Sequence, residues 1–518
     1  MLWIALHFPQ LAIDCVSRGH GETLLSSLPL VIHAGPAQRP TLYALNSAAH
    51  EAGLKVGMAL AAARAVCGTL TALPRTVEKE QSALQRLAIQ LAQFTPSVTV
   101  DQVSHGILLE VSTTMTLFGG IAQLIGEVRR AVRTQGFQAL VGIAPTPMAA
   151  QLLARVTQYH PATRMCRDVG QLSERLADVP LALFYWPHET INTLATLGLT
   201  RIKDLCQLPR HGLQQRFGDA VLNDLDRARG LAGDPRPYVV LPEKFTSERE
   251  FLFEVHESER LMPFAETMFV EMEGFLRARG AATQTVVVTL KHGRNASTHI
   301  TLGTREPARH ASHWLRLLRE KFSRAELAAA VIEMSVRADQ LCPYLAETSN
   351  LLRNTPTSRH ESVNSLMDRL SARLGEKAVY QVDVNNDHRP EFAWRKRIDA
   401  NPIAATSGQI RQRQSRLYFS ATTSSASVSP ASAKRKATVG RRPSWILREP
   451  RALVGNDVPQ YHGPLTLLTG PERIETGWWD GKSVERDYFV AQNPQQEVCW
   501  IYRDYRFGRK WYLHGLFA

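Results

Sequence analysis

The sequence predicts an α+β protein built from several domains. The chain has 518 residues, more than one hydrophobic core normally serves. Residues 97–111 alternate apolar and polar side chains as a β-hairpin does, and residues 78–94 and 121–134 repeat apolar side chains at helical spacing. Residues 245–341 then follow the order strand, helix, strand, strand, helix, strand. Strands and helices therefore both contribute to the expected cores.

The composition is that of an ordinary globular protein without a membrane segment. Hydrophobic residues make up 44% of the chain and charged residues 21%. No apolar run reaches the roughly 20 residues that a membrane span needs. The amino terminus lacks a basic leader and meets Pro9 too early for a signal peptide. The six cysteines form no Cys-x-x-Cys pair, so we expect neither a metal site nor a disulfide framework, no cofactor, and a cytoplasmic location.

The net charge of +13 is concentrated in one segment. Between residues 395 and 442 there are eleven Lys or Arg residues against one acid, Asp399. This segment supplies +10 of the formal charge, which leaves +3 for the rest of the chain. The basic balance is therefore weak evidence for a folded DNA-binding surface.

One strand of the predicted hairpin carries a family resemblance. Residues 103–111 read VSHGILLEV and are followed by Leu117-Phe-Gly-Gly120. This stretch resembles the central palm hairpin of Y-family (lesion-bypass) DNA polymerases, which reads Ser-Ile-Asp-Glu-Ala-Tyr-Leu-Asp-Val. Aligned without gaps, the catalytic Asp-Glu pair falls on His105 and Gly106. The family's first strand carries Asp-x-Asp, where this chain has only His7 between apolar residues. The resemblance therefore implies a right-hand polymerase-like fold that lacks its catalytic carboxylates.

Further segments extend this resemblance to the palm and the fingers. Residues 52–67 resemble the fingers, in which a Tyr and an Arg hold the triphosphate; Ser47 and His50 replace them. Residues 141–154 resemble the second palm motif, with Gln151 at a position where the family has a lysine. We expect a palm at 1–165 with the fingers inserted at about 11–76, and mostly helical structure over 41–75.

The resemblance also implies two DNA-holding domains and a helical extension. The thumb is expected at 166–240, with a helix-hairpin-helix-like segment that offers backbone N–H groups to phosphates. The little finger is expected at 244–345, and a helical extension at 346–400. The DNA-binding candidates are Gly198, Thr200 and Arg201 in the thumb and Arg249, Lys291 and Arg294 in the little finger.

Residues 401–443 are rich in Ser, Ala and Thr and predict a disordered basic linker. This linker is either solvated chain or a nonspecific DNA tether. Within it, the candidate residues for sliding-clamp binding are Gln414, Leu417, Tyr418 and Phe419, which match a Gln-x-x-Leu-x-Phe-like peptide. The alternatives are a chance apolar island, or the poorer match at 340–344.

Residues 444–518 predict a compact Trp-rich domain. They contain five of the nine tryptophans, and residues 470–481 read GPERIETGWWDG. This motif and the terminal Leu-His-Gly-Leu-Phe517 resemble the ImuB-type branch of the Y-family, which the resemblance implies to be catalytically silent. Tryptophans in a small β-rich domain either form its core or anchor a protein partner. The partner-binding candidates are Arg473, Trp478, Trp479 and Trp511.

Three functional hypotheses follow. The first is a noncatalytic adaptor in damage-induced (SOS) mutagenesis and translesion synthesis. It would bind primer-template DNA and recruit a sliding clamp, an error-prone replicative-type polymerase and a RecA-like accessory protein. The second is an active translesion polymerase with a rebuilt metal site, in which His105 serves as a ligand rather than as a hydrogen-bonded surface residue. The third is a structural DNA-binding protein, which leaves the Trp-rich domain unexplained. The missing carboxylates favour the adaptor.

Overall fold

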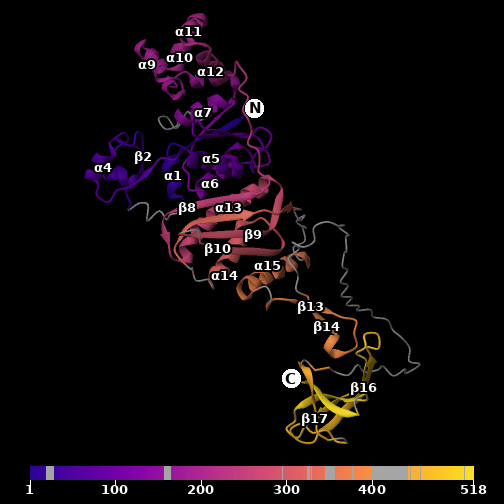
Figure 1. Ribbon diagram of the computed structural model, residues 1–518. Coiled ribbons are helices and arrows are strands. Elements are labelled where there is room, and N and C mark those ends of the chain that lie inside the picture. The colour runs from indigo at the N-terminus through magenta and orange to yellow at the C-terminus, as the bar shows by residue number, and fades with distance from the viewer. Residues whose placement is uncertain are drawn as a thin grey trace, which may run out of the picture. The chain divides into compact units, whose positions relative to one another are not determined.

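The computed structural model divides the chain into two compact units, Met1–Gly375 and Glu376–Ala518 (Figure 1). The first unit mixes helices and strands, and the described part of the second is built mainly from strands, which confirms the predicted α+β multidomain class. None of the described helices is long and apolar enough to cross a membrane. The structure describes residues 1–18, 28–156, 165–293, 296–323, 327, 329–344, 356–375, 378–397, 442–443, 445–455, 457–506 and 508–517.

A four-stranded antiparallel sheet lies at the centre of the first unit. Its order is β5-β6-β1-β7, so β1 (Trp3–His7) lies between β6 (Gly106–Glu110) and β7 (Leu140–Ala144), with β5 (Val98–Asp101) at one edge. Both faces are buried. Ile4 and Leu6 share a core with helices α5 (Val77–Leu91) and α6 (Ile121–Thr134), whereas Trp3 and Ala5 share one with α7 (Pro147–Val156).

Close contact between α7 and β7 fixes one edge of this sheet. A Cβ atom at Gly142 would lie 2.2 Å from both Ala150 O and Ala154 N. Only glycine allows the helix to approach the strand at this distance. Sequence positions 141–154 therefore form one rigid strand–helix unit, and α7 places Gln151 and Arg155 behind the end of β1.

The segment expected to be mostly helical is a small mixed subdomain. A three-stranded sheet of order β3-β2-β4 is formed by Leu30–Ala34 (β2), Thr41–Leu45 (β3) and Thr71–Pro74 (β4). Only Ser47–Glu51 (α3) and Leu60–Val66 (α4) are helical within 41–75, so that expectation was wrong for both ends of the segment. Alanines at 44, 48, 49 and 52 have helical spacing in the sequence, but Ala44 lies in β3, where Leu42 and Ala44 face the core.

Short helices pack together next to α7 (Figure 1). They include α9 (His188–Thr196), α10 (Ile202–Cys206) and α12 (Asp219–Arg229). The remaining elements between residues 165 and 231 are η2 (Val169–Gln171), α8 (Leu172–Leu176), η3 (Leu181–Leu183) and α11 (Arg210–Phe217).

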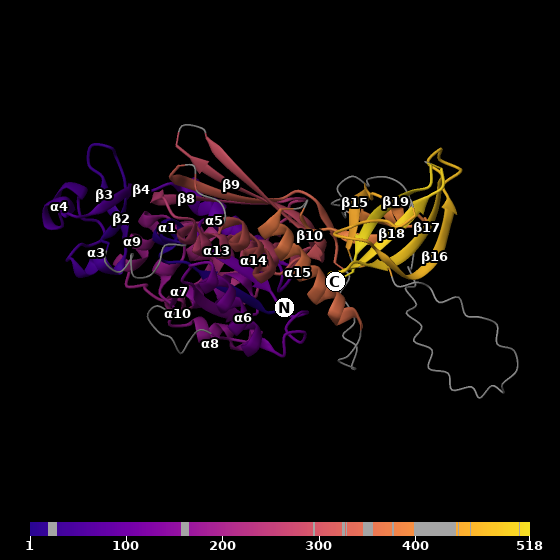
Figure 2. The same cartoon turned by 90° about the horizontal axis from the view of Figure 1, so that it is seen from below.

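The predicted strand–helix order over 245–341 is confirmed. The strands pair in the order β10-β9-β11-β8, and helices α13 and α14 share a hydrophobic core with the sheet (Figure 2). A further helix, α15, packs against α14 and β10, where Arg305 pairs with Asp368 at 3.0 Å. The elements are β8 (Phe245–Val255), η4 (Ser258–Leu261), α13 (Met262–Ala278), β9 (Ala281–His292), β10 (Ser297–Ala308), α14 (Ala311–Phe322), β11 (Val331–Ala338), β12 (Leu341–Pro343) and α15 (Pro356–Leu374).

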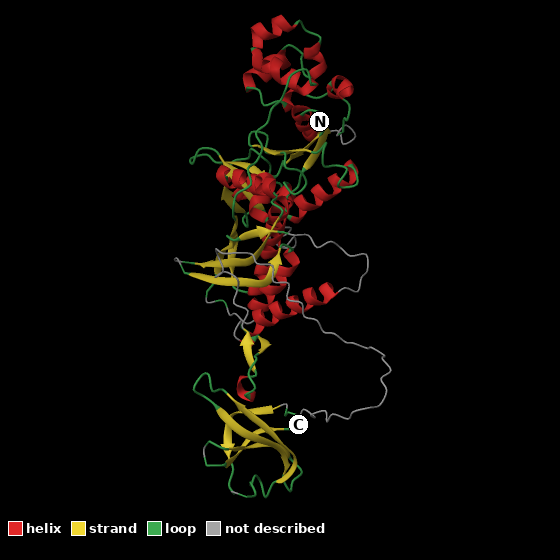
Figure 3. Cartoon of the chain, turned by 90° about the vertical axis from the view of Figure 1, so that its right-hand side faces the viewer, coloured by secondary structure: helices red, strands yellow, loops and turns green. Residues whose placement is uncertain are grey.

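The second unit is dominated by a five-stranded antiparallel sheet of order β15-β19-β18-β17-β16 (Figure 3). Its strands are β15 (Trp445–Ala452), β16 (Thr466–Thr476), β17 (Val484–Gln492), β18 (Val498–Asp504) and β19 (Lys510–Leu516). Upstream residues 378–397 belong to this unit as well and contain β13 (Gln381–Val384), η6 (Pro390–Phe392) and β14 (Trp394–Arg397). Within the expected helical extension at 346–400, helix therefore occurs as α15, followed by a two-stranded hairpin.

A buried ion cluster joins helix α5, which packs on the central sheet, to β8 and α13. Glu271 Oε2 lies 2.5 Å from Arg249 Nη2, and Glu271 Oε1 lies 3.7 Å from Arg86 Nε. Burial opposes ionisation of Glu271, but the guanidinium groups of Arg249, Arg86 and Arg18 hold its pKa below the usual range. A Cβ atom at Gly274 would lie 2.5 Å from Gln90 Cγ, so α13 packs directly on α5. The cluster and this packing together fix residues 245–341 against the central sheet.

Replacement of Glu271 by Gln should lower the free energy of unfolding by about 3 kcal/mol, because buried guanidinium groups lose their counter-charge. Since the folded-state pKa of Glu271 lies below its unfolded value, its stabilising contribution is full above the ordinary Glu pKa and is lost as the pH falls through the lowered pKa. Urea unfolding at pH 7 is the measurement. Glu266→Gln, an exposed position on the same helix, is the control and should change little. Equal effects of the two substitutions would contradict the role of the cluster.

Candidate functional site: a polymerase-like cleft without its carboxylates

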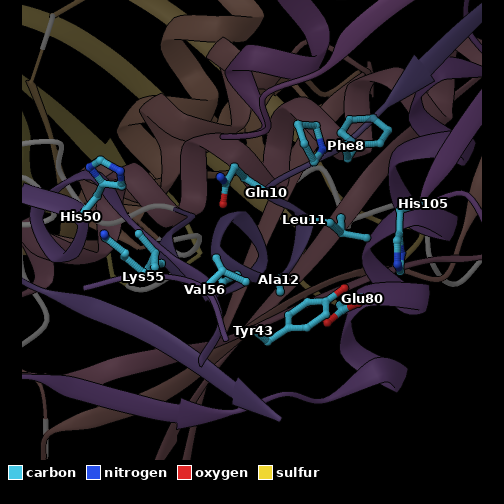
Figure 4. Close-up of a pocket in the computed structure, with 13 residues that line it drawn as sticks. Phe8, Gln10, Leu11, Ala12, Tyr43, His50, Lys55, Val56, Glu80 and His105 are labelled. Carbon is cyan, nitrogen blue, oxygen red and sulfur yellow. The ribbon is translucent and has the colours of Figure 1, made fainter. Parts of the chain in front are cut away.

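A cavity of about 500 Å³ opens between the central sheet and the small mixed subdomain. Figure 4 places His50 and Lys55 together at one side and His105 at the other, with Tyr43 beside Glu80. The walls come from the chain after β1, helix α1 (Leu11–Ser17), β3, α3, α5 and the β5–β6 turn. The lining residues are Phe8, Pro9, Gln10, Leu11, Ala12, Tyr43, Ala44, Leu45, His50, Lys55, Val56, Glu80 and His105.

His7 and Gly106 stand opposite each other in the register of β1 and β6. The Nδ1–H group of His7 donates to Ser104 O at 3.0 Å. Burial and the nearby charge of Arg155 lower the pKa of His7 to about 4, so the imidazole is neutral at pH 7. These positions were predicted to replace the catalytic carboxylates. The structure places the two positions side by side, but one holds a neutral imidazole and the other a glycine without a side chain.

Gly106 has no room for a side chain. A Cβ atom there would lie 2.9 Å from Ser104 Oγ and 3.1 Å from Leu6 O. Ser104 is itself buried and held in place, because Gln151 Nε2 donates to its hydroxyl at 3.3 Å. A carboxylate at position 106 would therefore require the β5–β6 turn to move.

His105 occupies the turn before β6 with a left-handed backbone, φ 46°. This conformation is uncommon for a residue with a side chain. The His105 carbonyl accepts a hydrogen bond from Phe8 N at 3.1 Å, which ties the turn to the end of β1. Burial lowers the pKa of His105, so its half-buried imidazole also adds no charge to the cavity at neutral pH.

The two acids nearest this point already have partners. Glu80 forms two 2.8 Å contacts with Arg75, whose guanidinium carbon lies 3.9 Å from the centre of the Tyr43 ring. Asp101 accepts hydrogen bonds from Gln151 at 2.5 Å and from the backbone N–H groups of Val103 and Ser104. Among the residues that the structure describes, no group of three or more His, Cys, Asp or Glu side chains is placed to hold a metal ion.

A two-metal polymerase site does not fit this arrangement. Magnesium prefers hard oxygen ligands, and two-metal catalysis needs carboxylates that hold both ions. The described cleft offers neutral imidazoles, a glycine and paired acids, with the buried cation Arg155 nearby. The described residues therefore do not supply the ligands for phosphoryl transfer through two metal ions.

The other predicted cleft residues differ in their exposure to solvent. Ser47 and His50 are exposed on α3, whose N-cap Asn46 accepts from Ala49 N at 2.9 Å. Gln151 is buried and links α7 to the β5–β6 turn through Asp101 and Ser104. The sequence analysis missed Ser104, Glu80, Lys55 and Arg155, because their role depends on contacts between distant segments.

The thumb candidates lie around the start of α10. Gly198 has φ 77°, and the N–H groups of Thr200 and Arg201 both donate to Asp204, at 3.0 and 2.8 Å. These hydrogen bonds lower the pKa of Asp204. The chain's own carboxylate thus takes the place that we predicted for a phosphate, and the Arg201 side chain pairs with Asp178 at 2.8 Å.

Arg249 was wrongly predicted as a DNA contact. In β8 the residues at 247 and 249 face the core, whereas 248 and 250 face outward, so Arg249 is 7% exposed and pairs with Glu271. Lys291 is exposed and pairs with Glu333 at 2.9 Å. Arg294 lies outside the described residues, as do the clamp-binding candidates Gln414, Leu417, Tyr418 and Phe419.

The outward face of this sheet carries little net positive charge. Neighbouring strands pair Glu250 with Glu333 and Glu333 with Lys291, and Glu248 lies opposite Ser335. Since phosphate binding depends on unpaired Lys and Arg side chains, this face is a poor electrostatic match for a DNA backbone.

The aromatic candidates of the terminal sheet divide into core and surface. Trp511 is 4% exposed and packs in the core with Leu513, so its prediction as a partner anchor was wrong. Trp478 and Trp479 are 80% and 55% exposed, and their rings meet edge to face at 5.6 Å. Arg473 is half exposed and pairs with Asp487 at 2.8 Å.

Because Ser104 Oγ and Leu6 O fill the space beside Gly106, glycine at this position should be required for stability. Gly106→Ala is expected to lower the free energy of unfolding by about 1–3 kcal/mol, as overpacking of a filled site does. Gly126→Ala is the matched control: a Cβ atom there meets nothing within 4 Å, and alanine favours the helix α6. Urea unfolding compares the two. Combination with Ser104→Ala, which removes the nearest atom, should recover part of the loss; a fully stable Gly106→Ala protein would contradict this packing.

The chain is similar to known proteins over different parts of its length. Residues 15–155 match the impB/mucB/samB family, in agreement with the predicted resemblance. The chain is 25% identical over 492 residues to Protein ImuB of Caulobacter vibrioides, which covers 90% of this chain and 100% of that protein. This full-length likeness bears out the predicted relation to the ImuB-type branch.

Other relatives are similar over shorter stretches. DNA polymerase IV of Dehalococcoides mccartyi is 24% identical over 269 residues, covering 51% of this chain and 67% of the relative. Among solved structures, DinB from Sulfolobus solfataricus aligns with a TM-score of 0.36 and 14% identity, covering 66% of this chain and 100% of DinB.

Proposed function

We propose that the chain is a noncatalytic adaptor in damage-induced mutagenesis and translesion synthesis. It would act in the cytoplasm at the nucleoid, hold primer-template DNA and recruit an error-prone polymerase, a sliding clamp and a RecA-like accessory protein. The observation that carries the proposal is the pairing of His7 with Gly106 at the positions where the resembled polymerases carry carboxylates, with Ser104 and Leu6 O filling the space beside the glycine. The likeness to Protein ImuB along 90% of the chain supports it.

The alternative is an active translesion polymerase with a rebuilt metal site. The relatives named DNA polymerase IV favour it. Such a site would have to recruit Glu80 and Asp101, which would first have to leave Arg75 and Gln151. Because both acids are already paired and the carboxylate positions are filled, the adaptor is the better-supported proposal.

The charge of the terminal domain favours a protein partner over DNA. Residues 378–397 and 442–517 contain fourteen Lys or Arg and twelve Asp or Glu, so this domain is almost neutral. Its exposed apolar side chains include Trp478 and Trp479. Interfaces between proteins favour Trp and Tyr anchors, whereas DNA binding needs a positive surface. We therefore assign recruitment of a protein partner to the surface around these two tryptophans.

The basic segment 401–441 and its candidate clamp peptide complete the proposal. An extended chain offers a short peptide to a clamp without a fixed pose, and its Lys and Arg residues would add DNA affinity that falls with salt. The outward face of the little-finger sheet is nearly neutral, whereas the basic segment is strongly positive. This difference supports the assignment of part of the DNA affinity to the basic segment.

The test is replacement of Trp478 and Trp479 together by Ala. We expect loss of binding to at least one of three purified probes, namely the same organism's sliding clamp, error-prone polymerase and RecA-like accessory protein, and loss of damage-induced mutagenesis. Primer-template affinity should stay unchanged. Trp445 in β15 of the same domain is also an exposed tryptophan, at 70%. Trp445→Ala is therefore the matched control and should retain every partner. Unchanged binding of all three probes by the double variant would overturn the recruiting role.

A further inference from the structure

A short segment upstream of the basic stretch is an integral part of the terminal domain. Glu391 in η6 pairs with Arg486 of β17 at 2.9 Å and lies 4.0 Å from His514 of β19. Burial lowers the pKa of His514 to about 4, and its Nδ1 lies 2.8 Å from the Tyr488 hydroxyl. Residues 385–392 are therefore joined to the middle of the five-stranded sheet, although more than forty residues separate 397 from 442 in the sequence.

Arg389 is the second and stronger point of attachment. Its side chain is 3% exposed and contacts two carboxylates: Nη2 lies 2.7 Å from Asp387 Oδ2 and 2.7 Å from Asp480 Oδ2. Nη1 also donates to Lys482 O at 3.1 Å. The hydrogen bonds that Arg389 donates to Asp387 and Asp480 raise the pKa of Arg389 well above its ordinary value. One guanidinium group thus closes the β16–β17 turn, which consists of residues 477–483.

The two exposed tryptophans belong to this same turn. Gly477 precedes them with φ 83°, and a Cβ atom there would lie 2.8 Å from Arg389 Nη1. The guanidinium carbon of Arg389 lies 5.8 Å from the Trp479 ring centre and 4.6 Å from that of Phe392. Arg389 therefore fills the space beneath the turn, and the tryptophans project from it.

We propose that Arg389 is the positioning residue of the Trp478–Trp479 surface, which is consequently assembled from both sides of residues 398–441. This inference rests on the proposed recruiting function and deepens it. The occupant of the surface is a protein with an apolar pocket that accepts the edge-to-face ring pair. Arg389 pairs with both acids beside the rings, Asp387 and Asp480, and offsets one of their two negative charges.

Removal of Arg389 changes both shape and charge at this point. Asp387 and Asp480 would then face each other without a cation, and each raises the cost of the other's ionisation. The turn would lose the hydrogen bonds that Arg389 donates to Asp480 and to Lys482 O. The tryptophans would remain exposed but without a fixed orientation, and ordering them again on binding costs affinity.

The experiment is a double-mutant cycle in the full chain. Arg389→Gln is combined with Trp478→Ala/Trp479→Ala, and affinity is measured for whichever of the three probe proteins the tryptophans bind. Arg389→Gln alone should weaken binding about tenfold, yet add little in the background without the tryptophans. Asp480→Asn removes the same contact from the other side and should match it. Arg395→Gln, an exposed arginine of the neighbouring β14, should leave binding unchanged.

A second pair of variants separates positioning from folding. Gly477→Ala and Gly481→Ala introduce the same left-handed backbone strain, at φ 83° and φ 75°, but only the first collides with neighbouring atoms, namely Arg389 Nη1 and Lys482 O, each at 2.8 Å. We expect Gly477→Ala to weaken binding and Gly481→Ala to retain it, with thermal unfolding recorded for both. Full binding by Arg389→Gln while the tryptophan variant loses it would overturn this inference alone. Full binding by the tryptophan variant would overturn the recruiting function and this inference with it. Additive losses in the cycle would reduce Arg389 to a general structural role.

Discussion

The pairing of β1 with β6 through His7 and Gly106 is the constraint on which the character of this chain depends. The polymerases that the sequence resembles carry carboxylates at these two positions, and two-metal catalysis depends on such ligands. In this chain the two positions hold an imidazole and a glycine. The space of one side chain is taken by Ser104 and by the Leu6 carbonyl, and the other position holds an imidazole that burial and Arg155 keep neutral. Because the vacated positions are packed, single substitutions cannot restore a carboxylate pair without moving the turn.

The charged groups around this point are also paired within the chain. Glu80, Asp101 and Asp204 are each engaged by groups of the chain itself, so acids and N–H groups that could serve a metal or a phosphate instead stabilise the fold. Arg249 is drawn into the buried cluster around Glu271, which fixes the β8–β11 sheet to α5.

The sequence predicted what depends on local periodicity. Helix α6 begins and ends where the apolar spacing predicted, and the element order over 245–341 is the observed one. It failed where side-chain direction or long-range contact decides. Arg249 lies on the inward register of β8, Trp511 packs in a core, and Ala44 lies in a strand that pairs with β2. The link between Arg389 and Asp480 spans 91 residues and leaves no local pattern to detect. For the cleft, alignment of the motifs predicted which positions lack carboxylates. The packing around Gly106 could not be predicted, because it involves Leu6 and Gln151, which are distant in the sequence.

The most direct measurement is primer extension by the purified full-length chain, with Mg²⁺ or Mn²⁺, all four nucleotides and an active DNA polymerase IV as positive control. The account predicts no template-dependent incorporation, while the protein still binds the same primer-template in a parallel assay. Incorporation that follows the template, persists in His105→Ala and disappears in Glu80→Gln or Asp101→Asn would contradict it, because a rebuilt metal site would then supply the missing carboxylates.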